Sequence, residues 1–303
     1  MDILRRMSQA LDYIEENLKS EIDFETVAKK AHCSSYNFQR MFSFITDVTL
    51  AEYIRRRRLT LAALEVQNSN ISVVDLAVKY GYESSAAFSR AFYHLHGIKP
   101  SSARNEGVAL KAYPKITLQI SIQGEKSMEY RIESKPAFDI YGLETICSTI
   151  GDENFLTTAQ LWQQNVANEE VYKLEEGAGK IPDFVGKNAP IPDRYCTVNA
   201  ASFPHPAEEN TFKYMLFCFK GTDNPPDKYV SVHVPAATYA VFPMALCKWE
   251  EIADLLSKQQ KRIFTEWFPT SDYELADAGD FVFYGVSGEL AYLELWYPLR
   301  KKA

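Results

Sequence analysis

The sequence contains no apolar run of the roughly 18 residues that a membrane-spanning helix requires. Charged residues interrupt the start of the chain between Asp2 and Glu16, so it lacks the apolar core of a secretory signal. Cysteine is also scarce, because five cysteines are scattered along 303 residues without a Cys-x-x-Cys pair. This odd, dispersed set argues against a disulfide framework and a zinc site. We therefore expect a cytoplasmic protein with no membrane association, no metal and no cofactor.

The two parts of the chain differ in net charge. The net charge of −7 divides into +1 for residues 1–107, with 14 basic and 13 acidic residues, and −8 for residues 108–303, with 19 and 27. The acidic excess thus lies in the second part and leaves the first free to present a locally basic face. The length suffices for two domains with separate cores.

Residues 76–104 have the pattern of two short helices joined by a tight turn. Gly81 supplies the turn, and Ser84 is the predicted N-cap of the second helix. Arg90 lies among small residues on the face opposite the apolar one, so this face can approach a surface such as DNA closely. The apolar residues at helical spacing are Leu76, Ala77, Tyr80, Phe88, Ala91, Phe92 and Leu95.

The same pattern occurs about fifty residues earlier. Phe38, Arg40 and Phe42 match Phe88, Arg90 and Phe92 at an offset of 50. We predict two helix-turn-helix units joined by one long helix over residues 47–69 and preceded by an amphipathic helix over 3–18. Two such units on one chain can place recognition helices in successive major grooves, about 34 Å apart.

The segments SSYNFQRMF, YIRRRRL and KYGYESSAAFSRAF, followed by HGIKPSSAR, carry a family resemblance. With them, residues 22–104 resemble the AraC/XylS family of bacterial transcription regulators, which implies a DNA-binding domain over residues 1–107. The base-facing positions that the resemblance implies are Tyr36, Gln39 and Arg40 in the first unit and Ser85, Ala86, Ala87, Ser89 and Arg90 in the second.

The two recognition helices differ in the chemistry they offer to DNA. Gln39 suits adenine and Arg40 suits guanine, whereas the second helix has few base donors and is expected to clamp phosphates and read shape. His32 stands where the family usually has glycine, which predicts a strained or looser first turn. Of the four arginines at 55–58, we expect one or two to bind phosphate and the others to pair internally.

From residue 108 onward the pattern changes to alternating strands, which with two helices predicts an α+β domain over residues 108–303. A Pro-Ala bend in KPAFDIYGL and again in VPAATYAVFPM indicates two β-α-β-β modules in one antiparallel sheet. Residues 175–211 are rich in Gly, Pro, Asn and Asp and predict an irregular loop. The expected strands are 116–122, 130–144, 212–219, 228–235, 237–244, 281–285 and 291–299, and the expected helices are 155–174 and 249–268.

This second part resembles the GyrI-like effector-binding domain, on the segments MEYRIESKPAFDIYGLE, VPAATYAVFP, EWFPTSDYE and ELWYPL and on Trp162. The resemblance implies a cleft between the two modules that binds small molecules, often lipophilic cations. The segment FVFY at 281–284 lacks an acidic residue that relatives often have, which favours a neutral or singly charged ligand.

The last strand contains the strongest candidate for ligand binding. Alternation places Tyr292, Glu294 and Trp296 on one face, where a carboxylate between two aromatic rings can bind a cation. Trp162 and Phe242 complete the expected effector-binding set. The alternative interpretations are a solvated sheet face with Glu294 in water, and a Trp162 that is simply part of the core.

We therefore predict a transcription regulator that binds promoter DNA and a small, lipophilic or cationic effector, with RNA polymerase as a further partner. The alternative is a hydrolase of reactive small molecules that uses Glu294 as its base, as the resemblance of some GyrI-like relatives to hydrolases implies. Drug sequestration without gene control is a third interpretation, which the complete helix-turn-helix half disfavours. Because the sequence contains no Ser-His-Asp or metal-binding pattern, we expect no enzymatic activity.

Overall fold

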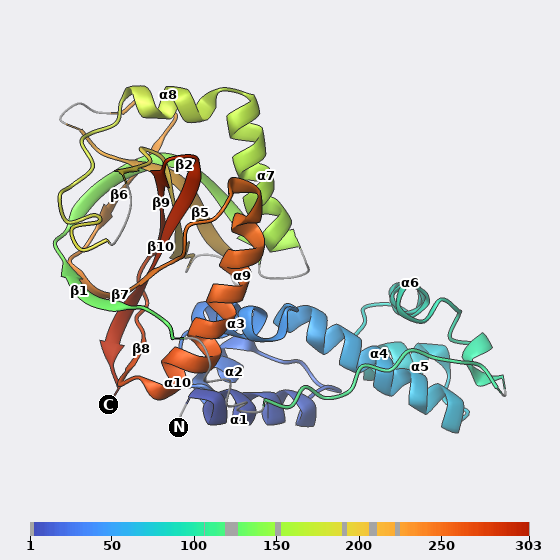
Figure 1. The fold of residues 1–303 in the computed structure, drawn as a ribbon. Helices are drawn as coiled ribbons and strands as arrows, with labels where there is room; N and C mark the ends of the chain where they lie inside the picture. The colour runs from blue at the N-terminus through green and yellow to red at the C-terminus, as the bar shows by residue number, and fades with distance from the viewer. Residues whose placement is uncertain are drawn as a thin grey trace.

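The computed structural model describes residues 3–105, 107–118, 127–148, 153–189, 193–205, 211–221 and 225–302. The N-terminal part is helical and the C-terminal part is built on an antiparallel sheet, which confirms the predicted fold class (Figure 1). The N-terminal helices are α1 (Ile3–Glu16), α2 (Phe24–Lys30), α3 (Ser35–Thr46), α4 (Leu50–Asn68), α5 (Val73–Lys79), α6 (Ser85–His96) and the 3₁₀ turn η1 (Ser102–Arg104).

Helices α2 and α3 form the first helix-turn-helix unit, and α5 and α6 form the second. Serine side chains cap both recognition helices: Ser34 accepts from the backbone N–H of Asn37, and Ser84, as predicted, from that of Ala87. The turns differ, because His32 adopts a left-handed φ of 57° where the second unit has Gly81 at 74°. A non-glycine residue in this region costs about 1–2 kcal/mol, so the first turn is strained, as predicted.

The C-terminal sheet has the strand order β1-β7-β10-β9-β4-β5-β2-β6, with β3 on β9 and β8 on β10. The strands are β1 (Arg131–Lys135), β2 (Phe138–Ser148), β3 (Arg194–Tyr195), β4 (Asn199–Pro204), β5 (Thr211–Phe219), β6 (Val230–Val234), β7 (Ala237–Pro243), β8 (Tyr273–Leu275), β9 (Asp280–Ser287) and β10 (Leu290–Lys301). The helices are α7 (Glu153–Ala167), α8 (Glu170–Glu176), η2 (Trp249–Glu251), α9 (Ile252–Arg262), the π-helical turn η3 (Ile263–Trp267) and α10 (Phe268–Thr270).

The sheet contains the two expected β-α-β-β modules. The first is β2-α7-β4-β5 and the second is β7-α9-β9-β10, joined where β4 pairs with β9. At Pro136-Ala137 and Pro235-Ala236 the chain crosses between modules, because β1 pairs with β7 and β6 pairs with β2. Each Pro-Ala bend therefore links an edge strand of one module to the first strand of the other.

Several details differ from the prediction. The expected strand 130–144 is divided at Pro136-Ala137 into β1 and β2. Strand β4 lies within 175–211, which was expected to be irregular; Asn-Ala-Ala-Ser has no β-branched residue, and pairing with β5 and β9 on both sides sets its conformation. The expected helix 155–174 is interrupted at Glu169, which has a left-handed φ of 61°. Residues 116–118 of the expected strand 116–122 are irregular, and the rest lie outside the described residues.

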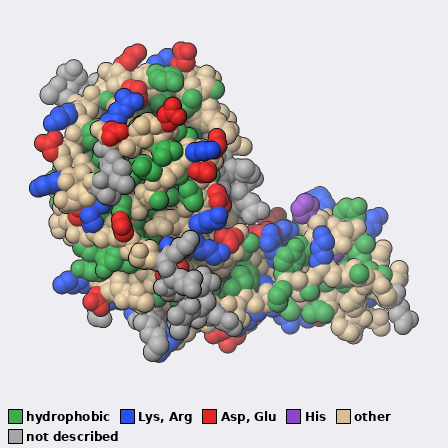
Figure 2. Space-filling model, viewed as in Figure 1, with side chains coloured by type: hydrophobic (Ala, Val, Ile, Leu, Met, Phe, Trp, Pro, Cys, Tyr) green, Lys and Arg blue, Asp and Glu red, His purple; other side chains and the backbone are tan. Residues whose placement is uncertain are grey.

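The hydrophobic core joins part of the N-terminal domain to the C-terminal domain. One buried cluster runs from α1–α4 into the helix-covered face of the sheet, for example from Phe42 to Phe264 and Leu295. A second cluster fills the opposite face of the sheet, under the segment that contains Phe184. The second helix-turn-helix unit has its own cluster around Phe92. It projects from the main body at the far end of α4 (Figures 1 and 2).

Candidate DNA-binding and effector-binding sites

The second recognition helix is open to solvent. In α6 the side chains of Ala86 and Arg90 are exposed, and those of Ser85, Ala87 and Ser89 are half-buried. The helix lies on the lobe that projects away from the C-terminal domain (Figure 1). Its predicted DNA-facing side is therefore available to a DNA groove in this conformation.

The first recognition helix lies against the C-terminal domain instead. Helix α3 contacts α9 and η3, and two of its predicted base-facing residues, Tyr36 and Arg40, hydrogen-bond to Asp280 of strand β9. Tyr36 is 9% exposed and Gln39 is 2% exposed, and the Arg40 side chain is 11% exposed. In this conformation none of these three side chains can reach a base.

A salt bridge between Arg40 and Asp280 is the centre of this contact. The two terminal nitrogens of the Arg40 guanidinium donate to the two carboxylate oxygens of Asp280. The distances are 2.5 Å from Nη1 to Oδ1 and 2.9 Å from Nη2 to Oδ2. Arg40 Nη1 also donates to the Tyr36 hydroxyl at 2.9 Å, and the guanidinium lies 5.4 Å from the ring centre of Phe44. Burial alone would lower the pKa of Arg40, but the Asp280 carboxylate outweighs it and raises the pKa. The pair is the bidentate, charge-assisted type that fixes geometry as well as charge.

Further contacts surround the salt bridge. Asp277 accepts hydrogen bonds from the Ser34 hydroxyl at 2.5 Å and from Asn37 Nδ2 at 2.9 Å. The rings of Phe44 and Phe264 stack at 5.3 Å with an interplanar angle of 16°. Polar, aromatic and apolar contacts therefore hold the same face of α3.

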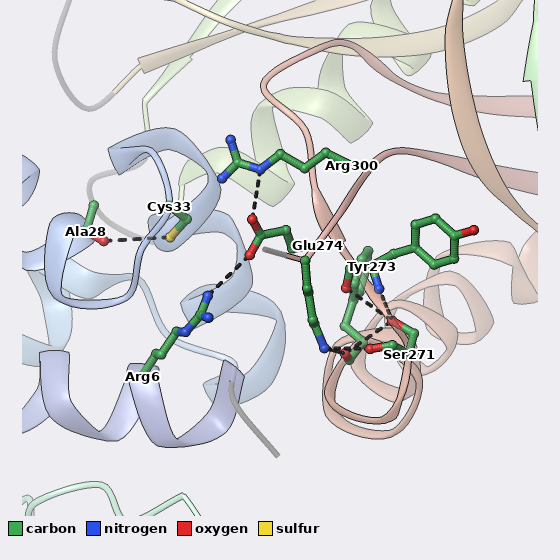
Figure 3. Close-up of polar contacts among 9 residues, drawn as sticks. Arg6, Ala28, Cys33, Ser271, Tyr273, Glu274 and Arg300 are labelled. Atoms are coloured by element: carbon green, nitrogen blue, oxygen red, sulfur yellow. Dashed lines mark hydrogen bonds and ion pairs between the residues drawn. The ribbon is translucent and has the colours of Figure 1, made fainter.

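A second ion pair links the domains beside the first unit. Glu274 of β8 lies between Arg6 of α1 and Arg300 of β10, with nitrogen–oxygen distances of 3.2 and 3.0 Å (Figure 3). Here, as at Arg40, the N-terminal domain supplies the cation and the acidic C-terminal domain the carboxylate. The pair of Lys261 with Asp47 crosses the same interface in the opposite sense, so the pattern holds for these two arginines and not for every ion pair there.

A cavity of about 140 Å³ lies at this interface. It is bounded by α3, α7 and α9 and by strands β4, β5 and β9, with Phe212, Tyr214, Val282 and Tyr284 on the sheet side. Trp162 of α7 supports this wall, because its indole N–H donates to the Tyr214 hydroxyl at 3.1 Å and its ring packs edge-on against Tyr284.

The predicted cation site at Glu294 lies on the opposite face of the sheet. Glu294 is completely buried, so the solvated interpretation is wrong. Its Oε1 accepts hydrogen bonds from Arg131 at 2.6 Å and from the Tyr292 hydroxyl at 3.0 Å, and its Oε2 accepts from the Trp296 indole at 3.1 Å. A buried carboxylate among aromatic rings thus already binds a planar cation from the chain itself.

Two cations on β1 share this face with Glu294. Arg131 also pairs with Glu133 at 2.9 Å, and Lys135 Nζ lies 4.3 Å from the ring centre of Trp296. Burial raises the pKa of Glu133, but hydrogen bonds from Asn188 and the two cations outweigh it and lower the pKa to about 2. The alternating charges of Arg-x-Glu-x-Lys on one strand face are a signal that sequence analysis could have used.

The predicted effector residues do not form one group. Tyr292, Glu294 and Trp296 lie together, but Phe242 lies on the helix-covered face against Trp267, with ring centres 5.1 Å apart. Trp162 is beside the interdomain cavity. Sequence analysis also missed Asp280 as the partner of Arg40, and the 240 residues between them leave no local signal.

The four arginines at Arg55–Arg58 all have partners within the chain. The first two pair with Glu52, the third pairs with Glu15, and the fourth donates to the backbone carbonyls of Leu18 and Ser20. Only Arg57 and Arg58 therefore fix α4 against α1 and the residues that follow it, because Glu52 lies on α4 itself. Any phosphate contact would draw on side chains that are already engaged in this conformation.

Membrane-spanning helices and metal-binding clusters are both absent from the described part of the chain. Within it, no helix has both the length and the apolar character needed to cross a membrane. Among the same residues, no three His, Cys, Asp or Glu side chains are grouped so as to hold a metal ion.

The fold and its two sites define a class: a helix-turn-helix DNA-binding regulator with a sensor-type α+β domain. Residues 27–106 match the family model for a helix-turn-helix domain, and residues 131–299 match that of the integron-associated effector binding protein. The chain belongs to the AraC-type transcription regulators and carries an effector-binding domain of the integron-associated family.

Individual proteins are similar to one or the other part of the chain. The regulatory protein SoxS of Salmonella typhimurium is 39% identical over 95 residues, which cover 31% of this chain and 89% of SoxS. Among solved structures, SAV2435 bound to tetraphenylphosphonium is 16% identical with a TM-score of 0.44, covering 57% of this chain and 94% of that chain. The integron cassette protein VCH_CASS2 of Vibrio cholerae is 14% identical with a TM-score of 0.36, covering 56% and 95%.

Proposed function

We propose that this regulator controls DNA binding by holding recognition helix α3 on its effector-binding domain until a small effector favours its release. The observation that carries the proposal is the Arg40–Asp280 pair, which binds the guanidinium that would otherwise read a base. Because one guanidinium cannot pair with Asp280 and with a guanine at once, the closed and DNA-bound states of α3 exclude each other.

The two states differ in how much DNA they can contact. In the closed state only α6 is free to enter a major groove, whereas the open state can place α3 and α6 in successive grooves. An effector shifts this balance only by its difference in affinity for the two states, and a complete switch requires about 5.5 kcal/mol of such difference. We propose that the protein acts in the cytoplasm on promoter DNA, with RNA polymerase as a further partner.

The substitution Asp280→Asn tests the closed state without altering any predicted DNA-facing residue. It leaves Arg40 buried without its counter-charge, so we expect α3 to separate from the domain. Affinity for a two-groove promoter site should rise by about tenfold, equivalent to about 1.4 kcal/mol. A mobility-shift titration measures this affinity, and hydroxyl-radical footprinting should reveal a second protected groove.

The matched control is Asp183→Asn, because Asp183 is 89% exposed and pairs only with Lys180 among the contacts described for it. This variant should bind DNA as the unaltered protein does. If Asp280→Asn gives the same affinity and the same footprint as this control, the proposed competition for α3 is wrong.

For the effector we propose a small lipophilic or cationic molecule that binds at Glu294. Support comes from the burial of this carboxylate between Tyr292 and Trp296 and from its acceptance of the Arg131 guanidinium. An entering cation would replace Arg131, which can remain paired with Glu133.

Calorimetric titration with tetraphenylphosphonium, a lipophilic cation, tests this site. Glu294→Gln removes the charge and should weaken binding at least about tenfold, or about 1.4 kcal/mol. The control is Glu250→Gln, at a glutamate that is 79% exposed. Equal binding by the unaltered protein and Glu294→Gln would exclude Glu294 as the cation ligand.

We propose no enzymatic activity for this face of the sheet. Both carboxylate oxygens of Glu294 already accept hydrogen bonds, so a base that activates water would first have to lose Arg131 or Trp296. Release of a hydrolysis product by the purified protein, abolished in Glu294→Gln, would overturn this statement.

A further inference from the structure

We propose that the interdomain cavity is a second ligand site, for a small aromatic compound with an amidine or guanidine group that takes the place of Arg40 on Asp280. This inference rests on the proposed competition for α3 and names a ligand that would act on it directly. The site is separate from Glu294, because Asp280, Val282 and Tyr284 line the cavity while Phe281 and Phe283 point to the opposite face with Trp296.

In the closed conformation the cavity has room for about one ring beside Asp280. Its volume of about 140 Å³ is close to that of an engineered apolar cavity of about 150 Å³ that binds benzene. Aromatic and aliphatic side chains form its sheet side, with Phe212, Tyr214 and Tyr284 among them. A single aromatic ring fits this space while α3 is still docked.

The charges at the cavity select a cation over an anion. Asp280 is fixed at the start of β9, where it stands opposite Ser202 of β4, and it stays with the sheet when α3 leaves. Arg40, by contrast, leaves with α3 and reaches water or DNA. The charge left behind is thus a carboxylate at an apolar face, which is costly without a partner. An anionic ligand would add a second negative charge to it.

The geometry of the existing pair specifies the shape of the cationic group. Asp280 accepts two parallel hydrogen bonds from the Arg40 guanidinium, an arrangement that a planar amidine or guanidine reproduces and an ammonium group does not. The guanidinium also lies 5.1 Å from the ring centre of Tyr36. When α3 leaves, Asp280 loses both the Arg40 cation and the nearby Tyr36 ring. A ligand that joins a planar cation to an aromatic ring therefore replaces both.

The ligand and α3 compete for the Asp280 carboxylate. Ligand binding therefore weakens the docking of α3, and the docking of α3 weakens ligand binding by the same factor. The ligand favours the open state and thereby increases DNA binding, and removal of Arg40 favours the ligand. This second effect distinguishes a competitor from a molecule that merely binds nearby.

Benzamidine is the probe, titrated calorimetrically into the full chain. Asp280→Asn should weaken binding at least tenfold, and Arg40→Ala should strengthen it at least threefold because the internal competitor is gone. Benzoate, with the same shape and the opposite charge, should not bind, and Glu250→Gln, at an exposed glutamate, should bind benzamidine as the unaltered protein does. Equal binding of benzoate, unchanged affinity in Asp280→Asn, or weaker binding in Arg40→Ala would each overturn the site.

The two proposals fail in different ways. If Asp280→Asn increases DNA affinity but benzamidine binds neither the unaltered protein nor Arg40→Ala, the ligand site is wrong and the competition for α3 stands. If Asp280→Asn leaves DNA affinity unchanged, the competition itself is wrong, and increased DNA binding with benzamidine is then not expected either.

Discussion

Helices α3 and α6 carry the same motif at an offset of 50 residues, yet one is covered and the other is free. Their apolar faces are equivalent, and each is capped by a serine. Their outer faces differ, because Tyr36, Gln39 and Phe44 in α3 correspond to alanine, serine and histidine in α6. The large side chains of α3 supply the area and hydrogen bonds for docking, so the same local structure leads to two tertiary environments.

The hydrophobic cores of the two helix-turn-helix units also differ in whether they contact the C-terminal domain. Phe42 of α3 belongs to the cluster that continues into the C-terminal domain, whereas Phe92 of α6 belongs to a separate cluster of the second unit. In this conformation the first unit shares a core with the effector-binding domain, and the second is attached to it through α4.

The largest expected effect concerns these cores. Phe92→Ala should destabilise the second unit by about 3–5 kcal/mol and leave the main thermal transition unchanged. Phe42→Ala, at the matching position in α3, should lower the main transition itself. Differential scanning calorimetry measures both, and an equal shift of the main transition by the two variants would show that the units share one cooperative core.

A smaller effect is expected at the DNA-facing residues. Without effector, Arg90→Ala should weaken DNA binding by roughly 1–3 kcal/mol, because α6 is the exposed recognition helix. Gln39→Ala should leave this binding unchanged and weaken it only when Asp280→Asn is also present. Mobility shifts of the two single variants and the double variant measure this dependence. A Gln39→Ala loss as large as that of Arg90→Ala would mean that α3 contacts DNA without any release.

The sequence predicted those features of the structure that depend on residues within a single helix, turn or strand. The cap at Ser84, the turn at Gly81 and the alternation around Glu294 were predicted from residues that are neighbours along the chain. The strain at His32 was predicted from the family resemblance, because relatives usually have glycine there. The docking of α3 was not, because Arg40 and Asp280 are 240 residues apart and each also fits a different role. Strand β4 was missed for a related reason, since its neighbours in the sheet and not its own residues determine it.

The exchange of edge strands at the two Pro-Ala bends affects synthesis of the chain. Strand β2 is made early, but its outer partner β6 is made only after the whole first module, and β1 must wait even longer for β7. Unpaired strand edges of this kind can join other chains. Neither module can therefore close its own edge, and a nascent chain that pauses before β6 presents an open sheet to the cell until translation resumes.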